Sequence, residues 1–415
     1  MKPANFKHGS GARSKYPSQI LNPEYITLWF GLFFFMLNLS TFNLLPYYLE
    51  LRGASPGLYG SVAGILGVSN FFSLILLGHR ADAWSRKRTV MFYFMFALGG
   101  NLAGLWAMEQ PELEWFYGVR LLQGIFMGLG FPLVFTWVVE VTPPSQKHLA
   151  LAWFGIGGIL ANSLGPSLGE LVLSLQGKSG DASGFYLVFL MALGFQLAAM
   201  AFFLITRDVA VQRDEEGARP GLAPLLRRRE TVLMLMVAWV FGGVFGVLMS
   251  FGKNYTASLG LSFVSVLLWA YSAGAVFSRI FIRQITGYLN EKRMIPLGLA
   301  GVAATFLLLS VAGNYPLLAF IGFLYGLSHG ILYPTLFVRM IDMQAPEELG
   351  RAATLYQGSY SVGWGLYPLT GGFLISVWGF PVFFLLLALL ASLAIPLHHQ
   401  AEILAEKRRR RQDGA

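Results

Sequence analysis

The segment Arg120–Pro132 reads RLLQGIFMGLGFP, and Gly322–Pro334, 202 residues later, reads GFLYGLSHGILYP. Both carry glycine at the fifth and ninth positions and proline at the thirteenth. The same offset relates four further pairs: Glu140 and Asp342, Pro144 and Pro346, Pro166 and Pro368, Gly169 and Gly371. Because Gly and Pro are common in membrane helices, one coincidence carries little weight. Seven at one offset indicate that the chain is an internal duplication.

The composition is that of a membrane protein. The 415 residues are 55% hydrophobic and only 12% charged, about half the charged fraction of a soluble domain. Apolar runs of roughly 20 residues, long enough to cross ~30 Å of hydrocarbon as helices, recur along the chain. We expect an all-α membrane protein with twelve transmembrane spans at 25–49, 56–78, 89–108, 114–139, 148–175, 184–206, 231–252, 260–282, 294–313, 316–340, 351–377 and 380–397.

A charged segment with Gly and Pro divides these spans into six and six. The expected order is an N-tail at 1–23, a six-helix bundle at 24–206, a linker at 207–230, a second bundle at 231–398 and a basic C-tail at 399–415. We also expect a short surface helix near 222–229 in the linker. Since each half crosses the membrane six times, both share one orientation and are related by a pseudo-two-fold axis along the membrane normal.

The net charge of +9 follows from topology. If the N-terminus is cytoplasmic and the spans alternate, most of the 30 Lys and Arg fall in cytoplasmic segments, as the positive-inside rule requires. We therefore expect both termini in the cytoplasm and a multi-pass protein of the cell membrane, with a bacterial inner membrane favoured. The tail Lys407–Arg411 (KRRRR) is read as a topology signal or a contact with anionic lipid rather than a nucleic-acid site. We expect no cleaved signal peptide, and the absence of cysteine excludes disulfides and thiolate chemistry.

Three motifs resemble signatures of the major facilitator superfamily. Gly78–Arg88 (GHRADAWSRKR) is similar to its span 2–3 signature Gly-x-Leu-Ala-Asp-Arg-x-Gly-Arg-Lys, departing at Arg80, Ala83 and Ser85. RLLQG (120–124) resembles the Arg-x-x-Gln-Gly motif of proton-driven exporters. NSLGPSLGE (162–170) resembles the Gly-Pro-x-x-Gly-Gly motif of antiporters, with Glu170 in place of the last glycine. The resemblance implies the twelve-helix fold of that superfamily and favours its drug/proton antiporter-like (arabinose-efflux-permease-like) exporters.

The span 2–3 loop is expected to act as a cytoplasmic latch. In the family its acid, here Asp82, keeps the outward-facing state closed on the cytoplasmic side, and we expect it to meet the N-terminus of span 11 near 349–352. Arg86 and Lys87 either pair with Glu140 or serve only as topology signals. The latch candidates, including the equivalent loop of the second half, are Gly78, Asp82, Arg86, Lys87, Glu140, Gly287 and Glu291.

Small residues and prolines of spans 5 and 11 are expected at the moving seam between the bundles, because small residues let helices approach closely. These antiporter-like residues are Gly165, Pro166, Gly169, Pro368 and Gly371. The alternative is ordinary membrane packing.

Arg120 and Glu170 are the candidates for proton coupling. Each lies inside a span, where a charge is expensive and marks a pathway or a partner, and their repeat equivalents are Gly322 and Gly372. We expect Arg120 and Glu170 to pair, and proton binding at Glu170 to free Arg120. Glu114 as the partner of Arg120, or a purely structural ion pair, are the alternatives.

Spans 1, 4, 7 and 10, with part of 11, are expected to line a central substrate cavity. The candidates are Asn38, Asn43, Gln123, Thr136, Trp239, Ser328, His329, Tyr333, Tyr356, Gln357 and Tyr360. This polar, aromatic set suits a neutral, amphipathic or anionic solute better than a polycation. His329 is expected either to bind substrate or relay protons, or to pack between helices.

The sequence therefore predicts a secondary transporter that exports a small organic solute by proton-coupled antiport and works as a monomer. A proton- or solute-coupled importer and a non-transporting sensor or scaffold are the alternatives. No enzyme chemistry, metal site or cofactor is expected, and the absence of a Walker loop argues against ATP-driven transport.

Overall fold

The chain folds into helices, as expected. The computed structural model describes residues 21–77, 85–208, 222–282, 284, 291–345 and 348–413, and no strand occurs among them. The first half comprises α1 (Pro23–Thr41), η1 (Phe42–Leu44), α2 (Leu45–Leu51), α3 (Pro56–Leu77), α4 (Arg86–Met108), α5 (Trp115–Val141), η3 (Pro144–Gln146), α6 (Lys147–Leu175), η4 (Ala182–Gly184) and α7 (Phe185–Ile205). The linker contains α8 (Ala223–Leu226), and the second half comprises α9 (Arg229–Ser258), α10 (Ser265–Ile280), α12 (Glu291–Leu309), α13 (Tyr315–Asp342) and α14 (Leu349–Asp413).

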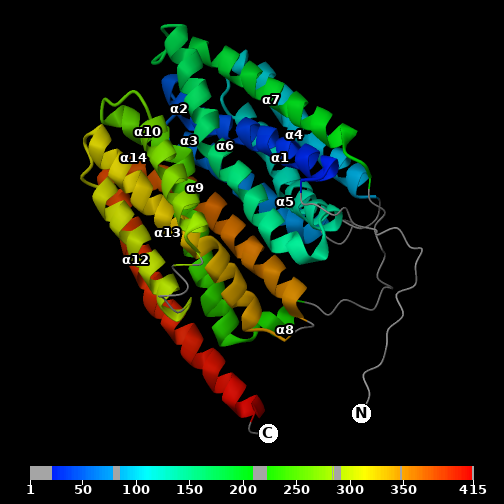
Figure 1. Ribbon diagram of the computed structural model, residues 1–415. Coiled ribbons are helices and arrows are strands. Elements are labelled where there is room, and N and C mark those ends of the chain that lie inside the picture. The colour runs from blue at the N-terminus through cyan, green and yellow to red at the C-terminus, as the bar shows by residue number, and fades with distance from the viewer. Residues whose placement is uncertain are drawn as a thin grey trace.

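The two halves lie side by side (Figure 1). α8 and the end of α14 lie at one end of the molecule, and α2 lies at the opposite end. We call these the α8 end and the α2 end. The α8 end contains the segments that the positive-inside rule led us to expect in the cytoplasm.

Helices occupy all twelve expected ranges. Nine helices among the described residues are long and apolar enough to cross a membrane, and the shorter apolar helices Ser265–Ile280 and Arg293–Leu309 occupy the ranges of spans 8 and 9. α14 covers the last two ranges, because two helices meet at Gly379, whose φ of +73° favours glycine. The exact count of twelve spans stays a prediction.

The first expected span is not one regular helix. α1 ends at Thr41, a 3₁₀ turn follows, and α2 continues with Pro46 in its first turn. Proline has no backbone N–H to donate, so it is tolerated in the first turn of a helix and breaks a longer one.

The repeat in the sequence corresponds to equivalent packing in the two halves. α3 packs against α5 as α10 packs against α13, and α4 packs against α5 as α12 packs against α13. At the crossing of α3 and α5, a Cβ on Gly124 would lie 2.6 Å from the carbonyl oxygen of Leu66. At the crossing of α10 and α13, a Cβ on Gly326 would lie 2.1 Å from that of Tyr271. The duplicated glycines therefore let each pair of helices approach backbone to backbone.

Candidate functional site

Glu170, near the end of α6, binds groups of the second half. Its Oε1 accepts a hydrogen bond from Lys253 Nζ of α9 at 2.7 Å and one from the backbone N–H of Val264 at 2.9 Å. Its Oε2 accepts one from the backbone N–H of Ser265 at 3.1 Å. Val264 and Ser265 form the N-terminus of α10, where free N–H groups and the helix dipole favour an anion. This carboxylate thus joins α6 to both α9 and α10.

The ion pair is almost fully buried, with side-chain exposures of 5% for Lys253 and 3% for Glu170. Lys253 also donates to the carbonyl oxygen of Ser262, and its Nζ lies 5.2 Å from the centre of the Tyr47 ring. Removing two charges from water is costly, and an ion pair survives burial only with additional hydrogen bonds of this kind.

A second polar contact joins the halves at the α2 end. Asn254 Nδ2 donates to Glu50 Oε2 at 2.7 Å, and the rings of Tyr59 and Phe251 meet edge to face at 5.6 Å. The other hydrogen bonds between the halves run from Ser163 to Ser272 and their neighbours, in the middle of α6 and α10. In the described residues, hydrogen bonds and ion pairs therefore join the halves from the middle of the molecule to its α2 end, which is closed.

The expected pair of Arg120 and Glu170 is not present. Arg120 Nη1 instead donates to Gln123 Oε1 of its own helix at 3.0 Å, and its Nε is buried without a partner in the described chain. Lys253 was not predicted as the partner of Glu170, because span 7 was expected to end at residue 252 and Lys253 was therefore placed in a loop. α9 continues to Ser258, so Lys253 is a buried helical residue.

The seam between the halves differs from the expected one. A Cβ on Gly165 would lie 2.1 Å from Ser40 Oγ of α1, and one on Gly169 would lie 2.5 Å from Leu44 Cδ1 of η1, so both glycines pack within the first half. Gly371 faces Phe383 within the second half. Of the expected seam residues, Pro368 lies at the interface through its carbonyl oxygen. Pro166 is a buried residue inside α6.

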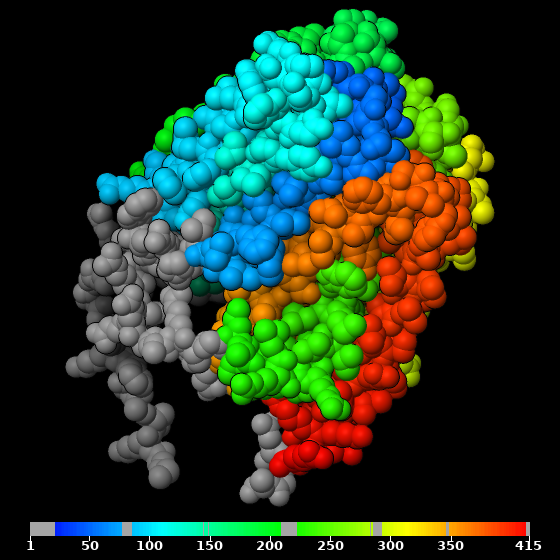
Figure 2. Space-filling view, turned by 180° about the vertical axis from the view of Figure 1, so that it is seen from behind, coloured from blue at the N-terminus to red at the C-terminus, as the bar shows by residue number. Residues whose placement is uncertain are grey.

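The close approach between the halves is made by glycines of α3 and α14. A Cβ on Gly64 would lie 2.4 Å from the carbonyl oxygen of Gly365, and one on Gly60 would lie 2.6 Å from that of Pro368. Figure 2 shows α3 (blue) against the first segment of α14 (orange). The Gly60-x-x-x-Gly64 spacing, which favours close helix packing, was the signal in the sequence that would have identified this seam.

The latch residues are described in part. Arg86 Nε donates to Glu140 Oε1 at 2.9 Å and Oε2 at 3.1 Å, so one of the two expected alternatives for Arg86 is present. Lys87 does not pair with Glu140; its Nζ donates to the carbonyl oxygens of Leu204 and Thr206. Gly78, Asp82 and Gly287 lie outside the described residues, as does the side chain of Glu291.

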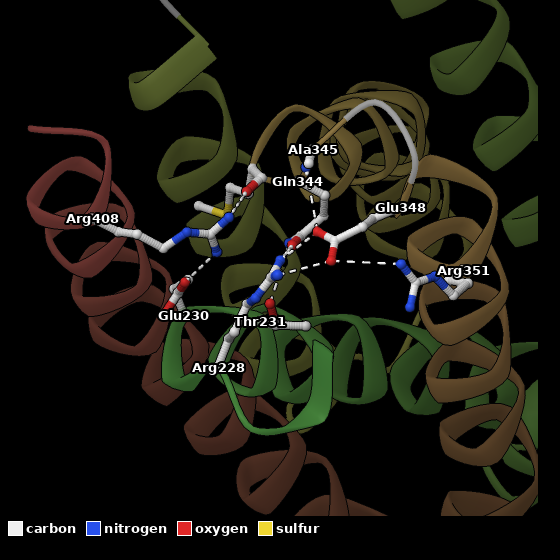
Figure 3. A network of polar contacts seen from close by, with 9 residues as sticks. Arg228, Glu230, Thr231, Gln344, Ala345, Glu348, Arg351 and Arg408 are labelled. Carbon is white, nitrogen blue, oxygen red and sulfur yellow. Dashed lines mark hydrogen bonds and ion pairs between the residues drawn. The ribbon is translucent and has the colours of Figure 1, made fainter. Parts of the chain in front are cut away.

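A network of ion pairs occupies the N-terminus of α14, where Asp82 was expected to bind (Figure 3). Arg228 pairs with both oxygens of Glu348, at 2.5 and 2.8 Å, and Arg351 Nη2 lies 3.6 Å from Glu348 Oε1. The hydrogen bonds from Arg228 hold the pKa of Glu348 below its usual value. Nearby, Arg408 Nη1 donates to Glu230 at 2.6 Å. The network ties Arg228, at the end of the linker, to the start of α14, and it ties the end of α14 to Glu230 at the start of α9.

An aromatic cluster surrounds His329 in the second half. Five rings have centres 4.7–6.0 Å from that of His329: Phe241 and Phe245 of α9, Tyr271 of α10, and Tyr325 and Tyr333 of α13. The sixth member is Tyr360 of α14, whose ring centre lies 5.6 Å from those of Phe241 and Tyr333. Tyr271 Oη lies 3.3 Å from His329 Nδ1. Tyr333 Oη donates to Gln357 Oε1 at 3.4 Å, and Tyr356 Oη donates to the carbonyl oxygen of Tyr333 at 3.5 Å. The structure therefore brings together five of the expected cavity residues of spans 10 and 11: His329, Tyr333, Tyr356, Gln357 and Tyr360.

The other expected cavity residues are dispersed. Asn38 Nδ2 donates to Asn101 Oδ1 at 3.0 Å and to the carbonyl oxygen of Ala192 at 2.8 Å, so its side chain binds within the first half. Gln123 packs against Gly100 of α4. Ser328 faces Gly301 of α12 and donates to its own helix.

Three further candidates have less specific positions. Thr136 Oγ1 donates to the carbonyl oxygen of Pro132 at 3.2 Å, within α5. The Trp239 ring packs edge to face on Tyr367 at 5.0 Å. Asn43 is a partly exposed residue of η1.

The chain is similar to several known transporters. It is 25% identical over 343 residues to a "Probable sugar efflux transporter" of Helicobacter pylori, covering 79% of this chain and 80% of the relative. It is 22% identical over 355 residues to the "Multi-drug resistance efflux pump PmrA homolog" of Lactococcus lactis, covering 83% and 86%.

Solved structures share the fold at lower identity. A mutant form of the nucleoside transporter NupG superposes with a TM-score of 0.76 at 14% identity over 92% of this chain and 100% of that one. A POT family transporter superposes with a TM-score of 0.76 at 12% identity, over 95% and 99%. The family model of the Major Facilitator Superfamily matches residues 28–295 and 271–410. With its helical fold, its repeated halves and this match over nearly the whole chain, the protein is a multi-pass membrane transporter of the Major Facilitator Superfamily.

Proposed function

We propose that this transporter exports a small organic solute in exchange for protons by alternating access, as a monomer with the α8 end in the cytoplasm. The observation that carries the proposal is the buried pair of Glu170 and Lys253. Alternating access requires the α2 end to open, and this separates the two halves there. Opening therefore breaks the bonds from Glu170 to Lys253, Val264 and Ser265.

Glu170 is suited to couple this motion to protons. With the α2 end open, its carboxyl group faces water outside and takes up a proton. When the end closes, the two carboxylate oxygens accept hydrogen bonds from Lys253 and two backbone N–H groups, and the proton leaves toward the α8 end, which then opens to the cytoplasm. Proton uptake and release at one residue then occur in different conformations, which is what coupling requires. In this proposal the cation that separates from Glu170, and that protonation of Glu170 keeps separate, is Lys253 in place of Arg120.

The direction of transport is supported by the relatives. Both relatives are named for efflux, one of sugar and one of multiple drugs. The motifs at 120–124 and 162–170 resemble those of exporters. For the outward-facing state, we propose that Asp82 closes the α8 end, with Arg86 anchored on Glu140 at the adjoining start of α4.

Reconstitution into liposomes with an imposed pH gradient tests this function. The probes are labelled arabinose, p-toluenesulfonate and ethidium, which represent a neutral sugar, an organic anion and an organic cation. An encapsulated pH dye follows the internal pH. We expect movement of at least one probe with a counterflow of protons, and loss of both in Glu170→Gln.

Glu112→Gln is the matched control, because Glu112 is an exposed acid in a loop at the same end of the molecule. It should transport as the unmodified protein does. If the rate of probe movement does not depend on the pH gradient and is unchanged in Glu170→Gln, the proposed coupling to protons is refuted. Failure of all three probes to move would refute export of small organic solutes.

A further inference from the structure

Arg279 lies between the two halves. It belongs to the last turn of α10 and is partly exposed. Its guanidinium extends to α6 of the other half, since a Cβ built on Gly155 would lie 2.6 Å from Arg279 Nη1. The contact continues the row in which Ser163 and Ile159 of α6 bind α10, one helical turn per step. Only a residue without a side chain leaves room for the guanidinium at this position.

No hydrogen bond or ion pair joins Arg279 to any residue that the structure describes. The other cations inside spans differ in this respect. Lys253 pairs with Glu170, and Arg120 donates to Gln123. A cation at membrane depth is expensive and normally faces a partner or a water-filled pathway. Arg279 is therefore a charged donor whose partner is not supplied by the described chain.

In the part of the chain that the structure describes, Arg279 interacts with hydrogen-bonding groups and with no acidic side chain. Tyr271, Tyr333 and His329 are the titratable side chains of the described chain that interact with it electrostatically. These three residues belong to the aromatic cluster. Among the described residues, the neighbours that interact with the charge of Arg279 are therefore the hydroxyl groups and the imidazole of the aromatic cluster, and none of them is a carboxylate.

A purely structural role explains less of this geometry. A cation in the last turn of a helix interacts favourably with the helix dipole, and Arg279 also fits the positive-inside rule. Neither effect needs the guanidinium to reach across to a glycine of the other half. Both would be served by a side chain that turned toward the headgroups.

We propose that Arg279 binds the negatively charged group of the transported solute, which makes the substrates small organic anions. This specificity rests on the proposed function as an exporter. The planar guanidinium offers paired N–H donors that match a carboxylate, sulfonate or phosphate. The solute reaches it from the α8 end, where no described hydrogen bond joins the halves, and the aromatic cluster holds the remainder of the solute. A bound anion then contacts α10 and α6 together, so it links the two halves of the protein.

Binding to the purified, detergent-solubilised protein tests this without transport. Two matched pairs of probes each compare an anion with its neutral amide, which has nearly the same size and shape: p-toluenesulfonate with p-toluenesulfonamide, and gluconate with gluconamide. Thermal stabilisation is measured against probe concentration at constant ionic strength, because a ligand of the folded state raises the melting temperature. We expect an anion to stabilise the protein more than its neutral partner does. Arg279→Gln should weaken that binding about ten- to hundredfold, and Arg279→Lys should weaken it less.

Gly155→Ala supplies a second variant that leaves Arg279 in place. The added methyl group would displace the end of a flexible side chain, so we expect a weaker anion affinity with little change in the melting temperature of the free protein. Gly158→Ala is the matched control, because its Cβ would lie 3.9 Å from Met36 in ordinary contact. Arg227→Gln removes an exposed cation outside the spans. Both controls should bind as the unmodified protein does.

Equal responses to the anions in the unmodified protein and in Arg279→Gln, including no response in either, would overturn the proposal. A transporter that binds anions through Arg279 but moves no protons would instead refute the coupling at Glu170. The two failures are therefore distinguishable.

Discussion

Lys253 Nζ lies 2.7 Å from Glu170 Oε1, and this buried pair joins α9 of the second half to α6 of the first. Each residue also has partners besides the other, so the pair is the centre of the polar contacts that close the α2 end. Its place between the halves leads to the first prediction.

Glu170→Gln should open the α2 end. Removing one partner of a buried pair costs about 3–5 kcal/mol, because the other charge remains buried alone. The chain has no cysteine, so Phe251→Cys supplies a unique label site at a position that is 1% exposed. We expect a membrane-impermeant maleimide, added from outside, to label that site at least tenfold faster in Glu170→Gln. The double variant Glu170→Gln/Lys253→Met should be less open than Glu170→Gln, and equal labelling of all variants would contradict a closing role.

Gly64→Val should prevent closure of the α2 end. The new side chain would meet the backbone carbonyl of Gly365 at 2.4 Å, and a carbonyl of α14 cannot move without displacing the helix. We expect at least tenfold slower transport, with high labelling at the Phe251→Cys site. Gly118→Val is the control, because nothing lies within 4 Å of its Cβ. Normal transport by Gly64→Val would show that α3 and α14 need not approach this closely.

Asn38→Ala should lower stability without changing substrate affinity. Asn38 is 1% exposed and binds Asn101 and the carbonyl oxygen of Ala192. Leaving these groups unpaired should cost about 1–3 kcal/mol, measured by denaturant unfolding in detergent. The KM of a transported probe should stay within twofold. A large rise in KM with unchanged stability would show instead that Asn38 binds the substrate, as the sequence led us to expect.

Glu348→Gln should destabilise the protein at neutral pH but not in acid. The pKa of Glu348 is lowered by its hydrogen bonds from Arg228, so the stabilisation is present above the usual carboxyl pKa and is lost as pH falls through the lower pKa of the folded state. We expect a loss of about 1–3 kcal/mol at pH 7. Thermal melting from pH 7 down to about pH 3 should show the variant and the unmodified protein converging below about pH 4. A difference independent of pH would assign the effect to packing.

Helices and their internal repeat were predictable because they depend on local pattern. Runs of apolar residues fix the spans, and the shared glycines of 124–132 and 326–334 mark equivalent helix crossings in both halves. The pair of Arg86 and Glu140 was one of two expected alternatives, since both residues were placed at the cytoplasmic ends of neighbouring spans. The expected resemblance to the superfamily is confirmed by the family match over most of the chain.

The partners of buried charges were not predictable in the same way. In a membrane helix that is apolar on all sides, periodicity does not indicate which face meets which neighbour. Arg120 and Glu170 were matched by depth on adjoining spans, but Glu170 turns to the second half and Arg120 to its own helix. Lys253 was assigned to a loop because a cation ends an apolar run in the sequence even where the helix continues.

The sequence by itself determined the membrane class, the helical spans, the duplication and the family, because each of these follows from composition and local spacing. The tertiary structure decided the seam of α3 with α14, the partner of Glu170 and the position of Arg279 against Gly155. These are contacts between residues far apart in the chain. They are set by how two rigid bundles meet in one conformation, and local sequence does not specify that.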